Sequence, residues 1–364
     1  MHRLLELQIK KLLKKKFEDL PEEFQSFILD INEAYQESDR TQGMLERIQE
    51  TSAIELDKYR EKEKEIALLQ SQISMFESVS RFVPLQFLKY LGKDDIREVQ
   101  LGNAVKMRMT VLFVDIRRFS SLSEKMSVED NFKFLNAFLM RMGPCIHDAG
   151  GFIDKFMGDG IMALFPLGGA GNGVSAAIKL QNALKKYNKD RLLVGYIPIE
   201  MGIGLNTGNL MLGTVGSSDR LATTVIGDSV NLASRLESLT SEMGVNTIIS
   251  GYTFDELADP SIYKIRNIGK VKVVGKDETV KIYEIFDADD PDVIEKKIEM
   301  RHLFEKALIS YQQANFIESI GYFQQCFDIY PEDKTVIKYI ERCTFLLRYP
   351  SIDNWQGVIV MSKI

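Results

Sequence analysis

The sequence has few of the residues that hold together disulfide-rich or zinc-binding proteins. Only three of its 364 residues are cysteines, and they follow no C-x-x-C spacing. An odd cysteine count without that spacing argues against a disulfide framework and against a zinc site. The three histidines lie in separate stretches and form no evident ligand set. We therefore expect the cysteines to be reduced thiols used for packing.

Long apolar runs and a surplus of basic charge are also missing. The longest apolar candidate, residues 109–114, has the length of a strand, whereas a membrane span needs about 18–20 residues. The first residues lack the apolar region and cleavage site of a secretory signal. A net charge of −6 gives little support to binding of a nucleic-acid backbone. These absences predict a cytoplasmic protein with no transmembrane segment and no nucleic-acid partner.

Residues 1–82 have a composition that favours helix, with one proline and one glycine among many Glu, Lys, Gln, Leu and Ile residues. A heptad pattern of apolar residues begins at Leu45 and continues through Ile48, Tyr59, Ile66, Leu69, Ile73 and Phe76. Polar residues interrupt this seam at Ser52, Glu55 and Lys62. The pattern predicts a parallel coiled coil that dimerises the chain and transmits a signal. A helix that packs on its own chain is the alternative.

After a linker over residues 83–106, the pattern changes twice. Short β-branched runs alternate with helical stretches and glycine-bearing turns over residues 107–289, which is typical of a mixed helix and strand domain. Helical periodicity returns over residues 290–364. One tetratricopeptide-like repeat is suggested there by Ala307, Tyr311, Phe316, Phe323 and Pro331. Because one repeat cannot bury both of its faces, we expect a docked helical cap rather than a free peptide-binding array.

The expected elements of the middle stretch follow its apolar runs. Strands are expected at 109–116, 161–166, 199–206, 223–227, 246–250 and 280–286. Helices are expected at 128–142, 173–187 and 228–239.

Two aspartates stand at positions where strands end. Asp115 follows a run of apolar residues, and Asp159 lies between Gly158 and Gly160 at the expected tip of a hairpin. Singly, Asp115 could cap a helix and Asp159 could be a turn residue. Two carboxylates that meet at one sheet edge would suit Mg²⁺, with substrate phosphates completing the coordination.

A third constellation lies in the segment TTVIGDSVNLASRLESL. Asn231 and Arg235 are four residues apart, so they share one face of the expected helix, beside its buried leucine stripe. An amide and a guanidinium placed there could hold a ribose oxygen and a developing phosphate charge. A simple surface pair is the alternative interpretation.

Taken together, the motifs FVDIRRFSSLS, DKFMGDGIMALF and TTVIGDSVNLASRLE resemble the catalytic domain of class III nucleotidyl cyclases, in its bacterial adenylyl cyclase branch. The resemblance covers about half of the chain. It implies an α+β fold with a ferredoxin-like βαββαβ core. It also implies conversion of ATP to 3′,5′-cyclic AMP and pyrophosphate, by attack of the ribose 3′-hydroxyl on the α-phosphate.

The resemblance assigns roles to individual residues. Asp115 and Asp159, with Ile116 in the same metal set, would hold two Mg²⁺ or Mn²⁺ ions per site. Lys155 and Thr224 would read the purine. Two further positions complete the set, with Asn231 orienting the ribose and Arg235 stabilising the transition state.

The purine pair decides the expected substrate. Adenine offers an acceptor at N1 and an amino donor at N6, so a lysine donor with a hydroxyl acceptor suits it, whereas guanine would want an acidic residue at Lys155. ATP is therefore favoured over GTP. A guanylyl or relaxed purine cyclase is one alternative, because Thr224 can donate as well as accept. A catalytically silent, regulatory cyclase-like module is another, but such a module has normally lost a metal aspartate or the arginine, and none is lost here.

Two positions depart from the family pattern. Val274 stands where the family commonly has a phosphate-binding lysine, so Lys276 is a candidate substitute, and Gly202 stands where many members carry an arginine.

The family's sites form between two head-to-tail catalytic domains. We therefore expect a homodimer held by the catalytic domains and by the coiled coil, and an upstream sensor or protein partner is possible at the helical ends.

Overall fold

The computed structural model describes residues 1–12, 16–80, 84–166, 168–217, 219–272, 278–348, 355 and 357–360. The chain divides into two compact units, Met1–Phe82 and Val83–Ile364. Within the described ranges, no helix combines the length and the apolar character that crossing a bilayer requires.

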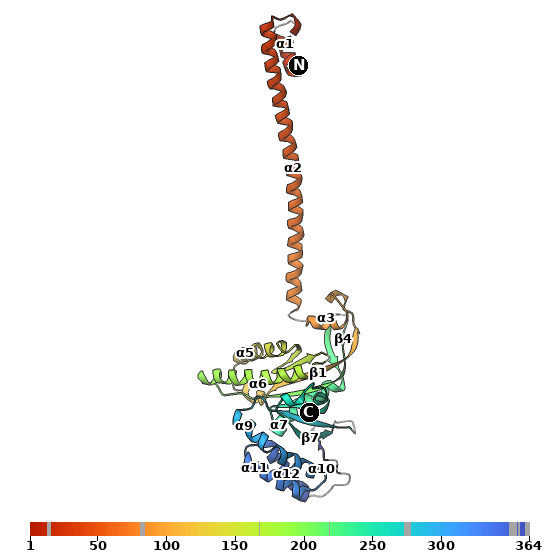
Figure 1. The fold of residues 1–364 in the computed structure, drawn as a ribbon, viewed down its shortest axis with the longest axis vertical. Helices are drawn as coiled ribbons and strands as arrows, with labels where there is room; N and C mark the ends of the chain where they lie inside the picture. The colour runs from red at the N-terminus through yellow and green to blue at the C-terminus, as the bar shows by residue number, and fades with distance from the viewer. Residues whose placement is uncertain are drawn as a thin grey trace. The chain divides into compact units, whose positions relative to one another are not determined.

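The first unit is a helical hairpin that continues as one long helix (Figure 1). It consists of α1 (Arg3–Leu12), the short 3₁₀ helix η1 (Phe17–Asp19) and α2 (Glu22–Ser80). Leu5 and Ile9 of α1 are buried against Ile28 of α2, where the side chains of Ile31 and Tyr35 also pack. The helix-favouring composition predicts helix throughout this unit, and α2 runs unbroken from Glu22 to Ser80 because no proline interrupts the segment.

Beyond the hairpin, the apolar seam of α2 is open. Between 51% and 68% of each side chain's surface is exposed at the heptad positions Leu45, Ile48, Tyr59, Ile66, Leu69 and Ile73. The side chain of Phe76 lies outside the described residues. An open stripe at heptad spacing is what a second helix would cover, so the coiled coil stays a prediction with a surface that fits it.

The second unit contains one mixed sheet and its covering helices. Its strands are β1 (Ala104–Ile116), β2 (Phe152–Met157), β3 (Gly160–Phe165), β4 (Met201–Gly216), β5 (Leu221–Ile226), β6 (Thr247–Ser250), β7 (Ile265–Lys272), β8 (Thr279–Ile285) and β9 (Ile359–Val360). Its helices are α3 (Leu85–Tyr90), α4 (Phe119–Ser123), α5 (Val128–His147), α6 (Ala170–Leu193), α7 (Asp228–Met243), α8 (Gly251–Asp255), α9 (Pro291–Glu299), α10 (Arg301–Gln312), α11 (Phe316–Ile329) and α12 (Lys334–Arg348). Two short 3₁₀ helices complete it, η2 (Ile96–Glu98) and η3 (Pro260–Ile262).

The ferredoxin-like core implied by the sequence motifs is confirmed. The sheet order begins β2-β3-β1-β4, and each of these neighbours is antiparallel. With α5 between β1 and β2, and α6 between β3 and β4, this is a βαββαβ unit. Both helices lie on the same face of the sheet (Figure 1). The six expected strands and three expected helices of this region all form, whereas β2 and β7 were not singled out as strands.

The remaining strands extend this core. β6, β8, β7 and β9 continue the sheet beyond β4, and β5 pairs with the far half of β4 as a separate arm. A second cluster of buried side chains covers the face opposite α5 and α6, and it includes Met109, Met162, Val225 and Val230.

The C-terminal helices share their core with the catalytic strands. One cluster of buried residues joins Leu232, Leu236 and Leu239 of α7 to Phe304 of α10 and Tyr339 of α12. The expected docked cap is thus part of the same compact unit, whereas its likeness to a tetratricopeptide repeat stays a prediction.

Buried charges tie the same helices to the sheet. Arg266 of β7 pairs with Glu284, its cross-strand neighbour on β8, and with Asp333, at 2.6 Å, just before α12. Lys297 of α9 lies 2.6 Å from both Glu284 and Asp289. Burial alone would raise the pKa of Asp333, but the charge and hydrogen bonds of Arg266 lower it.

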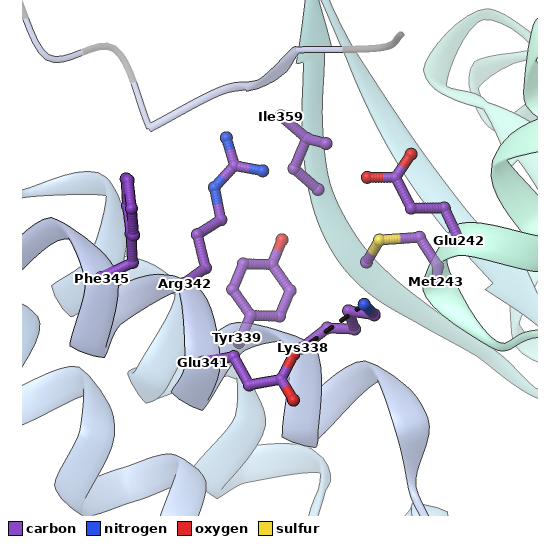
Figure 2. Close-up of a pocket in the computed structure, with 8 residues that line it drawn as sticks. All are labelled: Glu242, Met243, Lys338, Tyr339, Glu341, Arg342, Phe345 and Ile359. Carbon is purple, nitrogen blue, oxygen red and sulfur yellow. Dashed lines mark ion pairs between the residues drawn. The ribbon is translucent and has the colours of Figure 1, made fainter.

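A cavity of about 400 Å³ lies between the end of α7 and α12. Figure 2 shows its lining, with Glu242 and Met243 from α7, Arg342 and Tyr339 from α12, and Ile359 from β9. None of the residues assigned to catalysis from the sequence lines it.

Candidate active site

The two candidate metal aspartates lie at one edge of the sheet. Asp115 is the penultimate residue of β1, and Asp159 lies in the turn that joins β2 to β3. Because β1 pairs with β3, with Val114 opposite Ile161, the hairpin tip folds back beside the end of β1. A Cβ atom placed on Gly160 would lie 3.8 Å from Asp115 Oδ1. The chain thus brings both carboxylates to one place, as the sequence predicts.

The electrostatics of this pair fit a cation. Burial raises the pKa of Asp115 to about 8. The hydrogen bond with Asp159 and the negative charge of Asp159 act in the same direction. The Ile116 N–H donates a hydrogen bond to Asp115 Oδ1 at 3.0 Å, and this bond lowers the pKa of Asp115. A half-buried carboxyl group whose charge is disfavoured by a second carboxylate beside it is a suitable donor for a hard divalent ion, which would relieve the repulsion.

The pair does not form a complete metal cage. Within the described ranges, no group of three or more His, Cys, Asp or Glu side chains is gathered to hold a metal. Glu237 of α7 is near enough for its charge to raise the pKa of Asp115, and burial raises its own pKa to about 7. Further ligands of an ion at Asp115 and Asp159 would have to come from substrate, water or backbone oxygens.

The backbone of helix α7 lies directly against the backbone of β4, because β4 carries glycines where the two meet. A Cβ on Gly204 would come within 2.1 Å of the Glu237 backbone nitrogen. A Cβ on Gly202 would lie 2.2 Å from Thr240 Oγ1. The family's arginine at position 202 would therefore have to displace the side chains of Thr240 and Glu237. The side of α7 that carries Glu237 and Thr240 faces the sheet.

Asn231 and Arg235 lie on the opposite side of α7. At 100° per residue, both are turned about 160° from Ala233, whose carbonyl oxygen would lie 2.4 Å from a Cβ on Gly204. Asn231 is accordingly exposed and Arg235 is half-buried. At the start of the helix, Ser229 Oγ donates to the Asn209 carbonyl oxygen of β4 at 2.7 Å. Asn231 and Arg235 therefore lie on the side of α7 that is turned away from the sheet of their own chain.

Thr224 lies far from the aspartates of its own chain. Asp115 is opposite Gly202 on β4, and Thr224 of β5 is opposite Gly213 on the same strand. These two glycines are eleven residues apart in one strand, which corresponds to about 35 Å at ~3.3 Å per residue. An extended strand segment of that length is longer than a nucleotide triphosphate, which favours a site built from two chains over one built within a single chain.

Lys155 is placed by the β2–β3 hairpin. It lies opposite Met162, and its amine is 3.3 Å from Asp154 Oδ2. Lys276 and Val274 lie outside the described residues, so the phosphate-site candidate has no structural description.

Three features of this site were not expected from the sequence. These are the buried carboxylate of Asp154, the nearby Glu237, and the glycines of β4 that admit α7. The alternation of glycine with apolar residues in MGIGLNTG was a usable signal for the last, because glycine in a strand often marks close backbone approach. No sequence pattern marked the other two.

The fold, with its two aspartates at one sheet edge, is that of a class III nucleotidyl cyclase domain, and comparison with known families agrees. Residues 103–286 match the family described as the adenylate and guanylate cyclase catalytic domain. This match covers half of the chain, and the chain belongs to that family.

Two curated relatives match this chain over stretches of different length. The chain is 37% identical over 270 residues, 73% of its length, to the terminal-differentiation specific adenylate cyclase of Dictyostelium discoideum. It is 44% identical over 214 residues, 57% of its length, to an adenylate cyclase of Anabaena cylindrica. These alignments span only 13% and 43% of the two relatives. Much of each relative therefore has no counterpart in this chain.

Solved structures agree on the fold. The structure of a bacterial light-regulated adenylyl cyclase matches with a TM-score of 0.53 at 24% identity, over 62% of this chain and 65% of that one. At this identity the match supports the fold alone.

Proposed function

We propose that the protein is an adenylyl cyclase that converts ATP to 3′,5′-cyclic AMP and pyrophosphate. The observation that carries the proposal is the convergence of Asp115 and Asp159 at one sheet edge, where they form a pair suited to a divalent cation. Thr224 lies on the β5 arm, eleven residues along β4 from the level of Asp115. The names of the Dictyostelium and Anabaena relatives support adenylate cyclase activity.

Two chains arranged head to tail would complete two sites. In each site one protomer gives Asp115 and Asp159, and its partner gives the purine-reading and phosphate-stabilising residues. Because this association is two-fold, the same surfaces serve both sites. The position of Asn231 and Arg235 supports this arrangement, since both lie on the side of α7 turned away from the sheet and Asn231 is exposed.

In this proposal the chain's residues act by positioning and by charge. Asp115 and Asp159 hold the divalent ions, Mg²⁺ or Mn²⁺, which when bound would lower the pKa of the 3′-hydroxyl and neutralise the triphosphate. Asn231 orients the ribose so that the 3′-oxygen lies in line with the leaving pyrophosphate. Arg235 meets the negative charge that grows on the α-phosphate. As the O3′–P bond forms and the bond to pyrophosphate breaks, the hydroxyl proton leaves to solvent.

Lys155 and Thr224 make ATP the proposed substrate. The Lys155 amine can only donate hydrogen bonds, so it suits the N1 acceptor of adenine, and the Thr224 hydroxyl can accept from the N6 amino group. GTP would present a donor at N1 to the same amine, and the unmatched contact would cost affinity. A relaxed purine cyclase stays the second candidate, because the threonine hydroxyl can also donate.

The direct test is to identify the product. Purified full-length protein is incubated with Mn²⁺ and either ATP or GTP, and the products are separated and identified by mass. We expect cyclic AMP from ATP and little cyclic GMP. Equal turnover of both nucleotides would favour the relaxed cyclase, and no product from either would contradict the proposal. The Asp159→Asn variant is the matched control, because it keeps the size of the side chain but removes a metal-holding charge.

A further inference from the structure

Asp154 is a buried acidic residue without a role in the proposed mechanism. It lies in β2, directly before Lys155, and only 8% of its surface is exposed. Neither carboxylate oxygen has a well-oriented hydrogen bond among the described residues. Burying a carboxylate without such bonds costs several kcal/mol. A residue with this cost is expected to have a specific purpose.

Among the described residues, Asp154 forms one ion pair, and its partner is Lys155. The Lys155 Nζ lies 3.3 Å from Asp154 Oδ2, which is ion-pair distance, although the groups are not aligned as a regular hydrogen bond. The Asp154 side chain is fully buried, whereas 38% of the Lys155 side chain is exposed. The pair therefore links an inner carboxylate to an amine that reaches the surface. Burial raises the pKa of Asp154, and the charge of Lys155 acts in the opposite direction.

A β-bulge makes this contact possible. Neighbouring residues of a regular strand point to opposite faces of the sheet. In β2, however, Ile153 is opposite Ala163 and Lys155 is opposite Met162, so Asp154 is an extra residue. A bulge of this kind allows two successive side chains to lie near each other and changes the direction of those that follow.

The bulge also decides which face Lys155 occupies. Ile153 and Ala163 belong to the core that packs against α5 and α6, whereas Met162 belongs to the core on the opposite face. Residues directly opposite in an antiparallel pair point to the same side. Lys155 therefore shares the face of Met162. In a regular strand, with Asp154 paired rather than bulged, Lys155 would point to the same face as Ile153, toward α5 and α6.

We propose that Asp154 is a positioning residue that holds the Lys155 amine in the place from which it reads the purine. This rests on the proposed function, in which Lys155 donates to adenine N1. A lysine has a flexible stem and a compact charge, so its direction is poorly defined unless a partner restrains it. Asp154 is too deeply buried to touch a nucleotide, so it acts through Lys155.

The test measures nucleotide preference in full-length protein. Values of kcat and KM are determined with ATP and with GTP for wild type, Asp154→Asn and Asp154→Ser. We expect each Asp154 variant to lower the ratio of kcat/KM for ATP to that for GTP by about tenfold, mainly through a higher KM for ATP. The control is Asp130→Asn, which removes a carboxylate 3.9 Å from Lys133 in an exposed pair and should leave the ratio unchanged.

A double-mutant cycle with Lys155→Met separates positioning from a structural role. If Asp154 acts through Lys155, Asp154→Asn should not change the ratio further once Lys155 is methionine. An unchanged ratio in Asp154→Asn, or an additional change in the Lys155→Met background, would overturn the inference. Failure of both Asp154 variants to fold would also overturn it, because the carboxylate would then serve the fold.

The outcomes also separate this inference from the function on which it rests. If wild type makes no cyclic nucleotide, both are wrong. If wild type prefers ATP, and Lys155→Met removes that preference while Asp154→Asn does not, then the proposed function survives and the role of Asp154 is refuted.

Discussion

The helices before the catalytic strands and those after them look alike in sequence but differ in structure. In α2, the apolar heptad residues from Leu45 to Ile73 are more than half exposed. In α10 to α12, by contrast, large side chains such as Phe304, Phe323 and Tyr339 are fully buried in a core shared with α7 and the sheet. The chain accordingly separates into two units at Phe82, and not after β8.

This difference indicates two kinds of attachment. The C-terminal helices stabilise the cyclase domain, because the same cluster buries the leucine stripe of α7, the helix that carries Asn231 and Arg235. The N-terminal helices have apolar surface left for a partner. They are therefore suited to bring catalytic domains together, whereas the C-terminal helices are suited to hold one catalytic domain in shape.

Removing residues 290–364 should have the largest effect. The deletion would expose Leu232, Leu236, Leu239 and their neighbours in the shared core, and each large apolar side chain contributes about 1.5–3 kcal/mol when buried. The sum exceeds the ~5–15 kcal/mol that stabilises a typical domain. We expect an aggregated or unfolded protein by circular dichroism and gel filtration. A soluble, cooperatively folded product would show that the C-terminal helices are an independent attachment.

Breaking the buried ion network should have the next largest effect. Arg266→Met would leave Asp333 without its cation and Glu284 with Lys297 alone, and loss of one partner in a buried pair typically costs about 3–5 kcal/mol. The matched control is Lys185→Met, which removes an exposed ion pair with Asp290 and should cost at most about 1 kcal/mol. Urea unfolding measures both. Equal losses for the two variants would contradict a structural role for the network.

Deleting residues 1–82 should leave the catalytic unit folded. We expect the melting temperature of the remaining chain to stay close to that of the full chain, because the deleted residues form a separate unit. Activity should fall by about tenfold or more at low protein concentration and recover as the concentration rises, since the seam of α2 would no longer support association. Unchanged activity at low concentration would refute the dimerising role of the helices.

The acidic pair should make metal activation depend on pH. Asp115, with a pKa raised to about 8, must lose its proton before a cation binds. The metal concentration for half-maximal activity should therefore fall by up to about tenfold per unit as pH rises toward 8, and level off above it. The measurement is cyclic AMP production by the wild-type protein against Mn²⁺ concentration at several pH values, and a half-maximal metal concentration that does not change with pH would contradict the prediction.

The same groups predict the effect of pH on stability without metal. The folded-state pKa values of Asp115 and Glu237 are raised, to about 8 and about 7, so the folded state holds protons that the unfolded chain releases. The free energy of unfolding should decrease as pH rises from about 4 to 8. Saturating Mn²⁺ should reverse this trend at the alkaline end. A melting temperature that rises with pH in this interval, without metal, would contradict these shifts.

Local patterns predicted the fold and the paired aspartates well. Strand alternation, helix periodicity and the hairpin glycines around Asp159 are local, and the motifs they carry are specific to one family. The six strands expected from apolar runs all formed. The hairpin glycines imply β2, but no apolar run predicts its bounds, because FIDKFM contains two charged residues and a bulge that together break its alternation.

Other features depend on long-range packing that no local pattern reports. Nothing in residues 290–364 shows that Asp333 would meet Arg266, 67 positions earlier, or that α7 would share its core with α12. The contact between Asp154 and Lys155 depends on an extra residue in a strand, which only the register reveals. The separation of Thr224 from Asp115 likewise appears only when both are placed along β4.

The central claim is that each active site is built from two chains, and a mixing experiment tests it most directly. Asp115→Asn and Arg235→Ala proteins, each inactive alone, are combined with different affinity tags so that heterodimers can be isolated. Each heterodimer would hold one intact and one doubly defective site, so an equal mixture should recover up to about a quarter of wild-type activity. Isolated heterodimers with no activity would contradict a site shared between protomers.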